Sequence, residues 1–130
     1  MTKELGLNIS EKRLRKLMEE VLLSVGCDKN SAMTTADVLI EADLRGYSTH
    51  GLIRLPAIVD RIQSGMINPK AKPHISKDNG TCSLVEGDRS IGAVGAKYGA
   101  ILAAKTALDK GCSTVGVINS DHICLTGYYA

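Results

Sequence analysis

The sequence contains no phenylalanine and no tryptophan, and its aromatic side chains are limited to four tyrosines and three histidines. A protein that binds single-stranded nucleic acid needs aromatic platforms for base stacking, and one that binds duplexes needs a strongly basic face. Here 16 Lys and Arg stand against 14 Asp and Glu, a net charge of only +2. We therefore expect no nucleic-acid partner.

Long apolar runs are also missing. No stretch approaches the roughly 18 apolar residues that suggest a membrane span, and the residues after Met1 lack the basic segment and apolar core of a secretory signal. With 44% apolar and 23% charged residues, the composition is that of a soluble globular protein. We expect a cytoplasmic protein with no membrane partner.

The four cysteines form no C-x-x-C pair, so the sequence predicts neither a structural zinc site nor a thioredoxin-like redox site, and no metal is expected. In a reducing compartment they should be free thiols. Because free cysteine is among the most buried residue types, we expect at least three of them to lie in the core. The four are Cys27, Cys82, Cys112 and Cys124.

Apolar residues at spacings of three and four predict three N-terminal helices. The first lies between Ser10, its N-cap, and Gly26, and the second covers about residues 30–44. The third follows Ser48-Thr49 and contains Pro56. Because proline cannot donate a helical hydrogen bond, the regular helix either begins just before Pro56 or is kinked there.

The remainder of the chain alternates between strand and helix patterns. Short β-like runs at 74–77 and 82–86 flank a turn and predict a hairpin, and a helix at about 93–110 precedes a strand at 114–118. The fold class is therefore α+β. We expect a helical domain over residues 1–70 and the start of an α/β domain over 71–130. Because a further helix is only beginning at the end, we expect the N-terminal, apparently truncated, part of a longer protein.

Two features of the pattern invite a functional interpretation. Asp43 continues the apolar stripe of the second helix, so it either caps or pairs locally or points into a site. The glycines at 87, 92, 95 and 99 match neither a dinucleotide-binding nor a P-loop motif. We assign these glycines to close packing.

His50 and Arg54 are the strongest candidates for chemistry. On a helical or near-helical path, residues four apart project from one face, which would place an imidazole beside a guanidinium. Imidazole exchanges protons near neutral pH, and arginine binds a carboxylate through two parallel hydrogen bonds. The pair would suit a small 2-oxo or 2-hydroxy acid, although on the spacing alone a helix-capping or surface role for His50 is the more common one.

His122 follows the predicted strand at 114–118, in the kind of loop where ligands bind. His74 lies in a β-like run flanked by lysines. We treat His74 as a surface residue without a role.

Several segments together resemble the malate/L-lactate dehydrogenase family of non-Rossmann nicotinamide-dependent oxidoreductases. The resemblance covers the chain from the first helix to Ala130. It is carried by Ala42-Asp43-Leu44-Arg45-Gly46, Ser48-Thr49-His50-Gly51, Arg54-Leu55-Pro56, Gly65-x-Ile67-Asn68-Pro69, Glu86-Gly87-Asp88, the segment from Gly92 to Gly111, Asn119-Ser120-x-His122 and Gly127-Tyr128-Tyr129.

The resemblance implies hydride transfer between NAD or NADP and a small 2-oxo or 2-hydroxy acid of malate, lactate or sulfolactate type, on a mixed-sheet, non-Rossmann fold. It also implies a homodimer. By carry-over, His50 is the catalytic acid/base assisted by Thr49, and Arg54 holds the substrate carboxylate. His122, Gly127 and Tyr128 would contact the dinucleotide.

The sequence departs from the family pattern at two motif positions. Thr49 stands where the family usually has serine, and Cys124 stands in His122-Ile123-Cys124 where it commonly has His-Phe-Gly. Glycine lets a backbone approach a ligand closely, and a cysteine side chain would obstruct that approach. The alternative to an oxidoreductase is therefore a truncated, non-catalytic remnant or interaction module that binds no cofactor.

Overall fold

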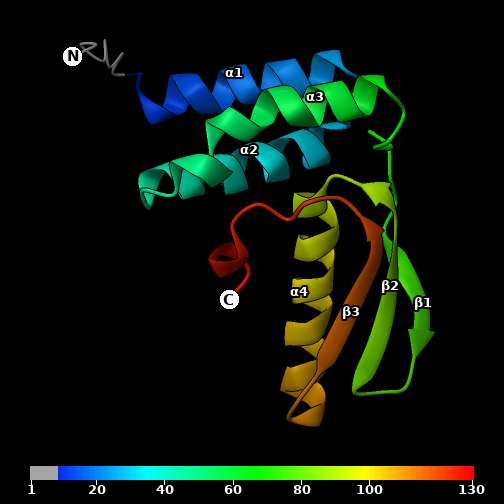
Figure 1. Ribbon diagram of the computed structural model, residues 1–130. Helices are drawn as coiled ribbons and strands as arrows, with labels where there is room; N and C mark the ends of the chain where they lie inside the picture. The colour runs from blue at the N-terminus through cyan, green and yellow to red at the C-terminus, as the bar shows by residue number, and fades with distance from the viewer. Residues whose placement is uncertain (1–8) are drawn as a thin grey trace.

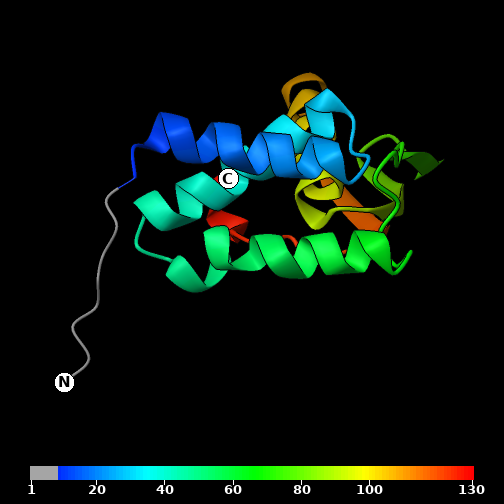
Figure 2. The ribbon, with the colours of Figure 1, turned by 90° about the horizontal axis from the view of Figure 1, so that it is seen from above.

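The computed structural model describes residues 9–130. Within them, four α-helices and a three-stranded mixed sheet form the α+β fold that the sequence predicts (Figure 1). Helices α1 and α3 run roughly parallel with α2 beneath them, and α4 lies along the sheet (Figures 1 and 2). Among these residues, no helix is both long enough and apolar enough to cross a bilayer.

Helix α1 spans Glu11–Ser24 and begins directly after Ser10, as predicted. It buries Met18 and Leu22 completely. Gly26 follows it with a φ of +98°, a left-handed conformation that ends a helix at little cost when the residue is glycine.

Helix α2 spans Lys29–Leu44 and is the most buried helix, with Ala36 and Leu39 fully inaccessible. The Asp28 carboxylate caps it by accepting the backbone N–H of Ser31 at 2.8 Å. Because α2 packs against both α1 and α4, it joins the helical layer to the sheet layer.

The third helical segment is divided into three parts. Residues Ser48–His50 and Leu52–Arg54 form short 3₁₀ turns, and helix α3 then spans Leu55–Gln63. Pro56 lies in the first turn of α3, where no helical N–H is needed, so the regular helix begins just before the proline and is not kinked by it.

The predicted hairpin is formed by β1, His74–Asp78, and β2, Cys82–Ser90, which pair antiparallel. Helix α4, Gly92–Lys110, then connects β2 to the parallel strand β3, Thr114–Ser120, giving the sheet order β1-β2-β3. As a result, the C-terminal end of β3 and the N-terminal end of α4 lie together at the end of the sheet that is nearer to the helical layer (Figure 1).

The glycines at 87, 92, 95 and 99 allow close packing, as expected. A Cβ on Gly92 would overlap the backbone of Asp121 and His122, and one on Gly99 would press into Val117. A Cβ on Gly87 would meet the carbonyl oxygens of β3. These glycines therefore bring α4 and β2 close to β3 and to the loop that follows it.

The prediction for the cysteines was only partly correct. All four are free thiols, but Cys82 and Cys112 are exposed and only Cys27 and Cys124 are buried, so the expectation of at least three buried cysteines was wrong. The physical reason is position. Cys82 begins β2 and Cys112 follows the end of α4, both at the end of the sheet that lies away from the helical layer.

Candidate active site

Asp43 organises the segment that carries His50 and Arg54. Its carboxylate accepts the backbone N–H of Leu52 at 2.8 Å, and it lies so close to Gly51 that a Cβ there would overlap it. Of the two roles considered for Asp43, the local structural one is correct. The carboxylate fixes the junction between the two 3₁₀ turns.

His50 and Arg54 are not joined directly, because the chain changes direction at Gly51 between the two turns. The predicted same-face pairing on one helix is therefore not what brings them together. His122 does so from the loop after β3. Its ring centroid lies 5.7 Å from that of His50, and its Nε2 lies 3.3 Å from Arg54 Nη2.

The hydrogen bonds of His122 fix its tautomer. Its Nδ1 accepts the backbone N–H of Cys124 at 3.0 Å, so in the neutral ring the proton resides on Nε2. Nε2 faces Arg54 Nη2, which can only donate. Two donors thus lie side by side with no acceptor between them, an arrangement that attracts an anionic or carbonyl oxygen.

The electrostatics of His122 agree with this geometry. Burial lowers the pKa of the imidazole below its ordinary value, the positive Arg54 and the neighbouring His50 lower the pKa further, and Asp121 partly opposes them. His122 is therefore mainly neutral near pH 7, with its Nε2–H available as a hydrogen-bond donor.

The remaining groups of the cluster are also oriented for binding. Arg54 Nε is buried without a hydrogen-bond partner among the described residues. The Thr49 hydroxyl lies 2.9 Å from His50 Nδ1, so it orients the His50 ring and leaves Nε2 of His50 for another partner.

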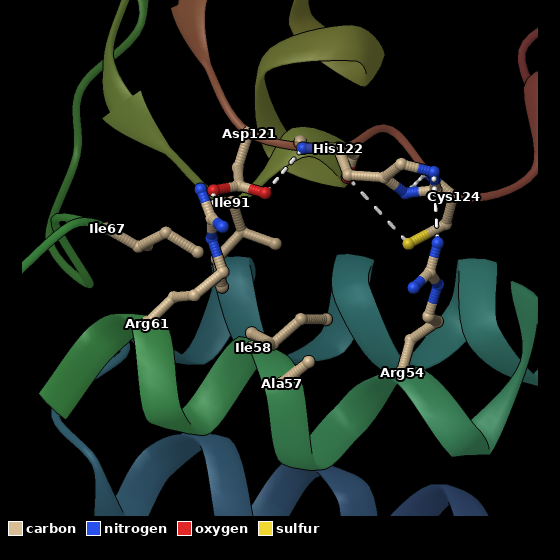
Figure 3. Close-up of a pocket in the computed structure, with 10 residues that line it drawn as sticks. Arg54, Ala57, Ile58, Arg61, Ile67, Ile91, Asp121, His122 and Cys124 are labelled. Carbon is tan, nitrogen blue, oxygen red and sulfur yellow. Dashed lines mark hydrogen bonds and ion pairs between the residues drawn. The ribbon is translucent and has the colours of Figure 1, made fainter. Parts of the chain in front are cut away.

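Arg54 and His122 line a cavity of about 260 Å³ between α3 and the loop after β3 (Figure 3). Its middle is apolar and its charged groups lie at the ends, which suits a small organic acid. The lining residues are Arg54, Ala57, Ile58, Arg61, Ile67, Ile91, Gly92, Asp121, His122 and Cys124.

Two residues of this site were missed from the sequence. Arg61 Nε donates to Asp121 Oδ2 at 2.7 Å, and Asp121 Oδ1 accepts the backbone N–H of His122 at 2.6 Å. Asp121 therefore holds His122 in place and ties it to α3. The available signal was that Arg61 follows Arg54, the residue just before α3, by seven residues.

Gly127 and Tyr128, predicted to contact a dinucleotide, do not line this cavity. They belong to a 3₁₀ turn, Thr126–Tyr128, that lies against α2. The Tyr128 hydroxyl donates to Asp37 Oδ2 at 2.5 Å, and Gly127 O accepts from Arg45 at 3.1 Å. The structure thus brings His50, Arg54 and His122 together, with Thr49 behind His50, and places Gly127 and Tyr128 apart from them.

Metal chemistry has no evident ligand set here. Within residues 9–130, no group of three or more His, Cys, Asp or Glu side chains is placed to hold a metal ion. The chemistry available to the cavity is carboxylate binding by guanidinium and proton exchange by imidazole.

A small cavity lined by two guanidiniums, one imidazole and an apolar middle has the chemistry of a site for a small organic anion. The chain belongs to the malate/L-lactate dehydrogenase family, whose sequence pattern matches residues 9–130. The resemblance found in the motifs is thereby confirmed.

Relatives in the family are dehydrogenases. The L-sulfolactate dehydrogenase of Methanocaldococcus jannaschii is 35% identical over 116 residues, which cover 89% of this chain and 34% of the relative. The malate dehydrogenase of Pyrococcus horikoshii is 36% identical over 124 residues, which cover 95% of this chain and 34% of the relative. This chain spans about a third of the length of these curated relatives.

Solved structures show the same fold. The malate dehydrogenase of Pyrococcus horikoshii OT3 superposes with a TM-score of 0.95 at 35% identity, over 100% of this chain and 37% of that one. The malate dehydrogenase of Entamoeba histolytica superposes with a TM-score of 0.91 at 40% identity, over 95% of this chain and 34% of that one. The arrangement of helices and mixed sheet is therefore the family fold.

Proposed function

We propose that this chain forms part of an oxidoreductase that transfers a hydride between NAD or NADP and a small 2-oxo or 2-hydroxy acid. The observation that carries the proposal is the pair of donors, Arg54 Nη2 and His122 Nε2, that face each other in the cavity without an acceptor. A substrate carboxylate or carbonyl oxygen supplies that acceptor. The relatives named for malate and sulfolactate act on acids of this kind.

Reduction of a 2-oxo acid adds a hydride to the carbonyl carbon and a proton to the carbonyl oxygen, and oxidation of the hydroxy acid removes both. The nicotinamide supplies or accepts the hydride when it is bound. His50 exchanges the proton, because the Thr49 hydroxyl fixes its Nδ1 side and leaves Nε2 for the substrate. Arg54 binds the carboxylate and orients the acid.

The cavity fits one end of a dinucleotide. Its volume of about 260 Å³ accommodates a small acid or a nicotinamide ring but not the whole cofactor. His122 would lie against the ring. Gly127 and Tyr128 would contribute to cofactor binding by holding the 3₁₀ turn Thr126–Tyr128 against α2. Gly127 O accepts from Arg45, and the Tyr128 hydroxyl donates to Asp37.

We further propose that the protein acts in the cytoplasm as a homodimer, with the division between its domains near residue 70. Support for self-association comes from large apolar side chains that are exposed and lie close to His50 and Arg54 in the sequence. Leu44 is 63% exposed, Tyr47 56% and Ile53 69%. Such neighbouring apolar groups are typical of surfaces that a second chain covers.

The test begins with titration of the purified chain with NADH and NADPH, followed by nicotinamide fluorescence, and a screen of 2-oxo acids for NAD(P)H oxidation. We expect saturable binding and turnover that falls by orders of magnitude in His50→Gln. Arg54→Lys should mainly raise KM for the acid. Unchanged turnover in His50→Gln together with a large loss in His122→Gln would assign the proton transfer to His122 instead.

One observation favours the second candidate, a remnant that binds no cofactor. Cys124 is buried, lines the cavity and has a φ of +59°, a conformation that glycine adopts with much less strain. A folded chain that ignores both dinucleotides would support this candidate. Recovery of binding in Cys124→Gly would identify the cysteine as the obstruction.

A further inference from the structure

A second cavity, of about 360 Å³, lies where the N-terminal half of α4 meets the start of α2. The short segment 71–73, which leads into β1, forms its third wall. This cavity shares no lining residue with the one that contains Arg54 and His122. Its volume falls within the roughly 300–1,000 Å³ of small-molecule sites. The molecule therefore has room for a small ligand at a second, separate place.

The second cavity has an apolar wall on α4. Val94 and Ile101 are seven residues apart and Tyr98 lies four residues after Val94, so the three side chains share one face of the helix. Ala71 and Pro73 add apolar atoms from the segment before β1. A ligand with an apolar body would bury that body against these side chains.

Lys97 gives the cavity a positive charge without a counter-ion. Its side chain lines the cavity, is half-buried, and makes no ion pair or hydrogen bond within residues 9–130. The other lysine of the cavity, Lys72, donates to Asp28 Oδ2 at 3.0 Å, so these two charges offset each other. Asp28 is the one acidic residue that lines the cavity. The lining thus carries one net positive charge, which suits a monoanion.

Thr34 adds a buried hydroxyl without a partner. Its side chain lines the cavity and is only 5% exposed. The hydroxyl of Thr35 donates to Ser31 O at 2.8 Å, but that of Thr34 makes no hydrogen bond in the described part of the chain. In the same part, the buried side-chain N and O atoms that lack both a partner and access to solvent are Arg54 Nε and Ser113 Oγ. The Thr34 hydroxyl is therefore reached from the cavity.

Lys97 and Thr34 approach the same stretch of α2. Asp37 follows Thr34 by three residues, one turn along the same face, and its carboxylate interacts with the positive charge of Lys97. Asp37 is not free to pair with Lys97, because both of its oxygens already accept hydrogen bonds from other residues. An ammonium and a hydroxyl thus lie near one another, and both can donate to a single carboxylate.

We propose that this cavity is a second binding site, for an organic monocarboxylate with an apolar body, whose carboxylate binds to Lys97 and Thr34. The body packs against Val94 and Ile101 on α4. A dianion would bind less well, because its second negative group would find no free cation and would be repelled by Asp28. The inference goes beyond the proposed function, since the candidate active site uses none of these residues.

The test titrates the chain with benzoate, benzamide and acetate and follows backbone amide resonances by NMR. Benzamide keeps the ring and removes the charge, and acetate keeps the charge and removes the apolar body. We expect benzoate to shift the amides of Val94 and Ile101 saturably, with a Kd on the order of 1 mM. Benzamide and acetate should each bind at least about tenfold more weakly.

Variants separate this cavity from the candidate active site. Lys97→Gln should lose about tenfold in affinity for benzoate and leave that for benzamide unchanged. Thr34→Val, which has nearly the same shape, should lose a smaller factor for benzoate. Arg54→Gln should leave the shifts at Val94 unchanged, because Arg54 lines the other cavity. Lys105→Gln is the matched control, since Lys105 is exposed on the same helix and does not line the second cavity.

Circular dichroism checks that each variant is folded. If Thr34→Val does not fold, Lys97→Gln and the benzoate-to-benzamide ratio of the unaltered chain still decide the outcome. Benzoate shifts confined to the surroundings of His122, equal affinities for benzoate and benzamide, or undiminished benzoate affinity in Lys97→Gln would each overturn the proposal. The absence of saturable shifts would do the same. All of these results would leave the proposed function intact, because it is tested with dinucleotides and 2-oxo acids at the other cavity.

Discussion

The carboxylate of Asp43 and the backbone N–H of Leu52 are joined by a hydrogen bond of 2.8 Å, and this bond fixes the segment that carries His50 and Arg54. We expect Asp43→Ala to lower the free energy of unfolding by about 1–2 kcal/mol, because the N–H loses its partner. Asp43→Asn keeps an acceptor and should recover part of the loss. Urea denaturation followed by circular dichroism measures both.

Asp60→Ala is the control for this change, because Asp60 is exposed on α3 and its side chain makes no hydrogen bond within the described residues. It should leave stability nearly unchanged. Equal effects of Asp43→Ala and Asp60→Ala would show that the contact with Leu52 is unimportant.

Gly92→Ala tests the close approach of α4 to the loop of the site. The added methyl group would overlap the backbone of Asp121 and His122, so the loop must move. We expect a loss of roughly 1–3 kcal/mol, as for other overpacked sites, together with changed NMR shifts of His122. Gly127→Ala is the control, since its Cβ would meet only Arg45 Nη1 at an ordinary 3.7 Å. Similar melting temperatures for the two variants would argue against this packing.

The titration of His122 should respond to its cationic neighbours. Burial, Arg54 and His50 lower its pKa below the usual 6.5. Arg54→Gln should therefore raise the pKa, but not fully to 6.5, because burial remains. Because the pKa of His122 is lower in the folded chain, the unfolded chain binds a proton at His122 at a higher pH than the folded chain does. The free energy of unfolding therefore carries no penalty from His122 above pH 6.5, and it decreases as the pH falls below 6.5. An NMR pH titration in which Arg54→Gln leaves the pKa of His122 unmoved would contradict the described contact.

Tyr128→Phe tests how the C-terminal turn is held. Burial and the adjacent Asp37 carboxylate raise the pKa of Tyr128 to about 12, so the hydroxyl remains a donor at neutral pH. Burial raises the pKa of Asp37, but hydrogen bonds from Tyr128 and Arg15 outweigh it and lower the pKa overall. Losing the hydroxyl should destabilise the fold by about 1 kcal/mol near pH 7.

The pH dependence provides a second readout of this contact. Because the pKa of Asp37 is lowered in the folded chain, its carboxylate stabilises the fold at pH values above its ordinary pKa of 3.8. This stabilisation is lost as the pH falls through the lowered pKa. The difference between Tyr128→Phe and the unaltered chain should therefore narrow below about pH 3.8. Tyr98→Phe should have little effect, because the Tyr98 hydroxyl makes no hydrogen bond in the described part of the chain. A constant difference from pH 7 to pH 3 would contradict the role of Asp37.

Local signals in the sequence predict much of the fold. Ser10 and Gly26 mark the limits of α1: the helix begins directly after Ser10, whose side chain makes no capping hydrogen bond, and the left-handed backbone of Gly26 follows its end. The turn between β1 and β2 was likewise recognisable from neighbouring residues. The burial of Cys82 and Cys112 was mispredicted, because it depends on which end of the sheet the helical layer covers.

The site was less predictable because it depends on contacts between distant residues. His50 and Arg54 were identified by type and spacing, but their meeting through His122 requires a contact across 68 positions. The pairing of Arg61 with Asp121 spans 60 positions and has no local signature. Likewise, the left-handed backbone at Asn119 and Cys124 follows from how the loop leaves β3, and neither residue is a glycine.

The two walls of the cavity come from distant parts of the chain, residues 54–61 on one side and residues 121–124 on the other. The acid of the proposed function, when held between Arg54 and His122, would act as a reversible cross-link that closes a loop of 68 residues. Because the unfolded chain cannot bind the acid in this way, the free energy of unfolding increases with the concentration of the acid. Thermal denaturation thereby becomes a means of ranking acids that requires no catalytic turnover.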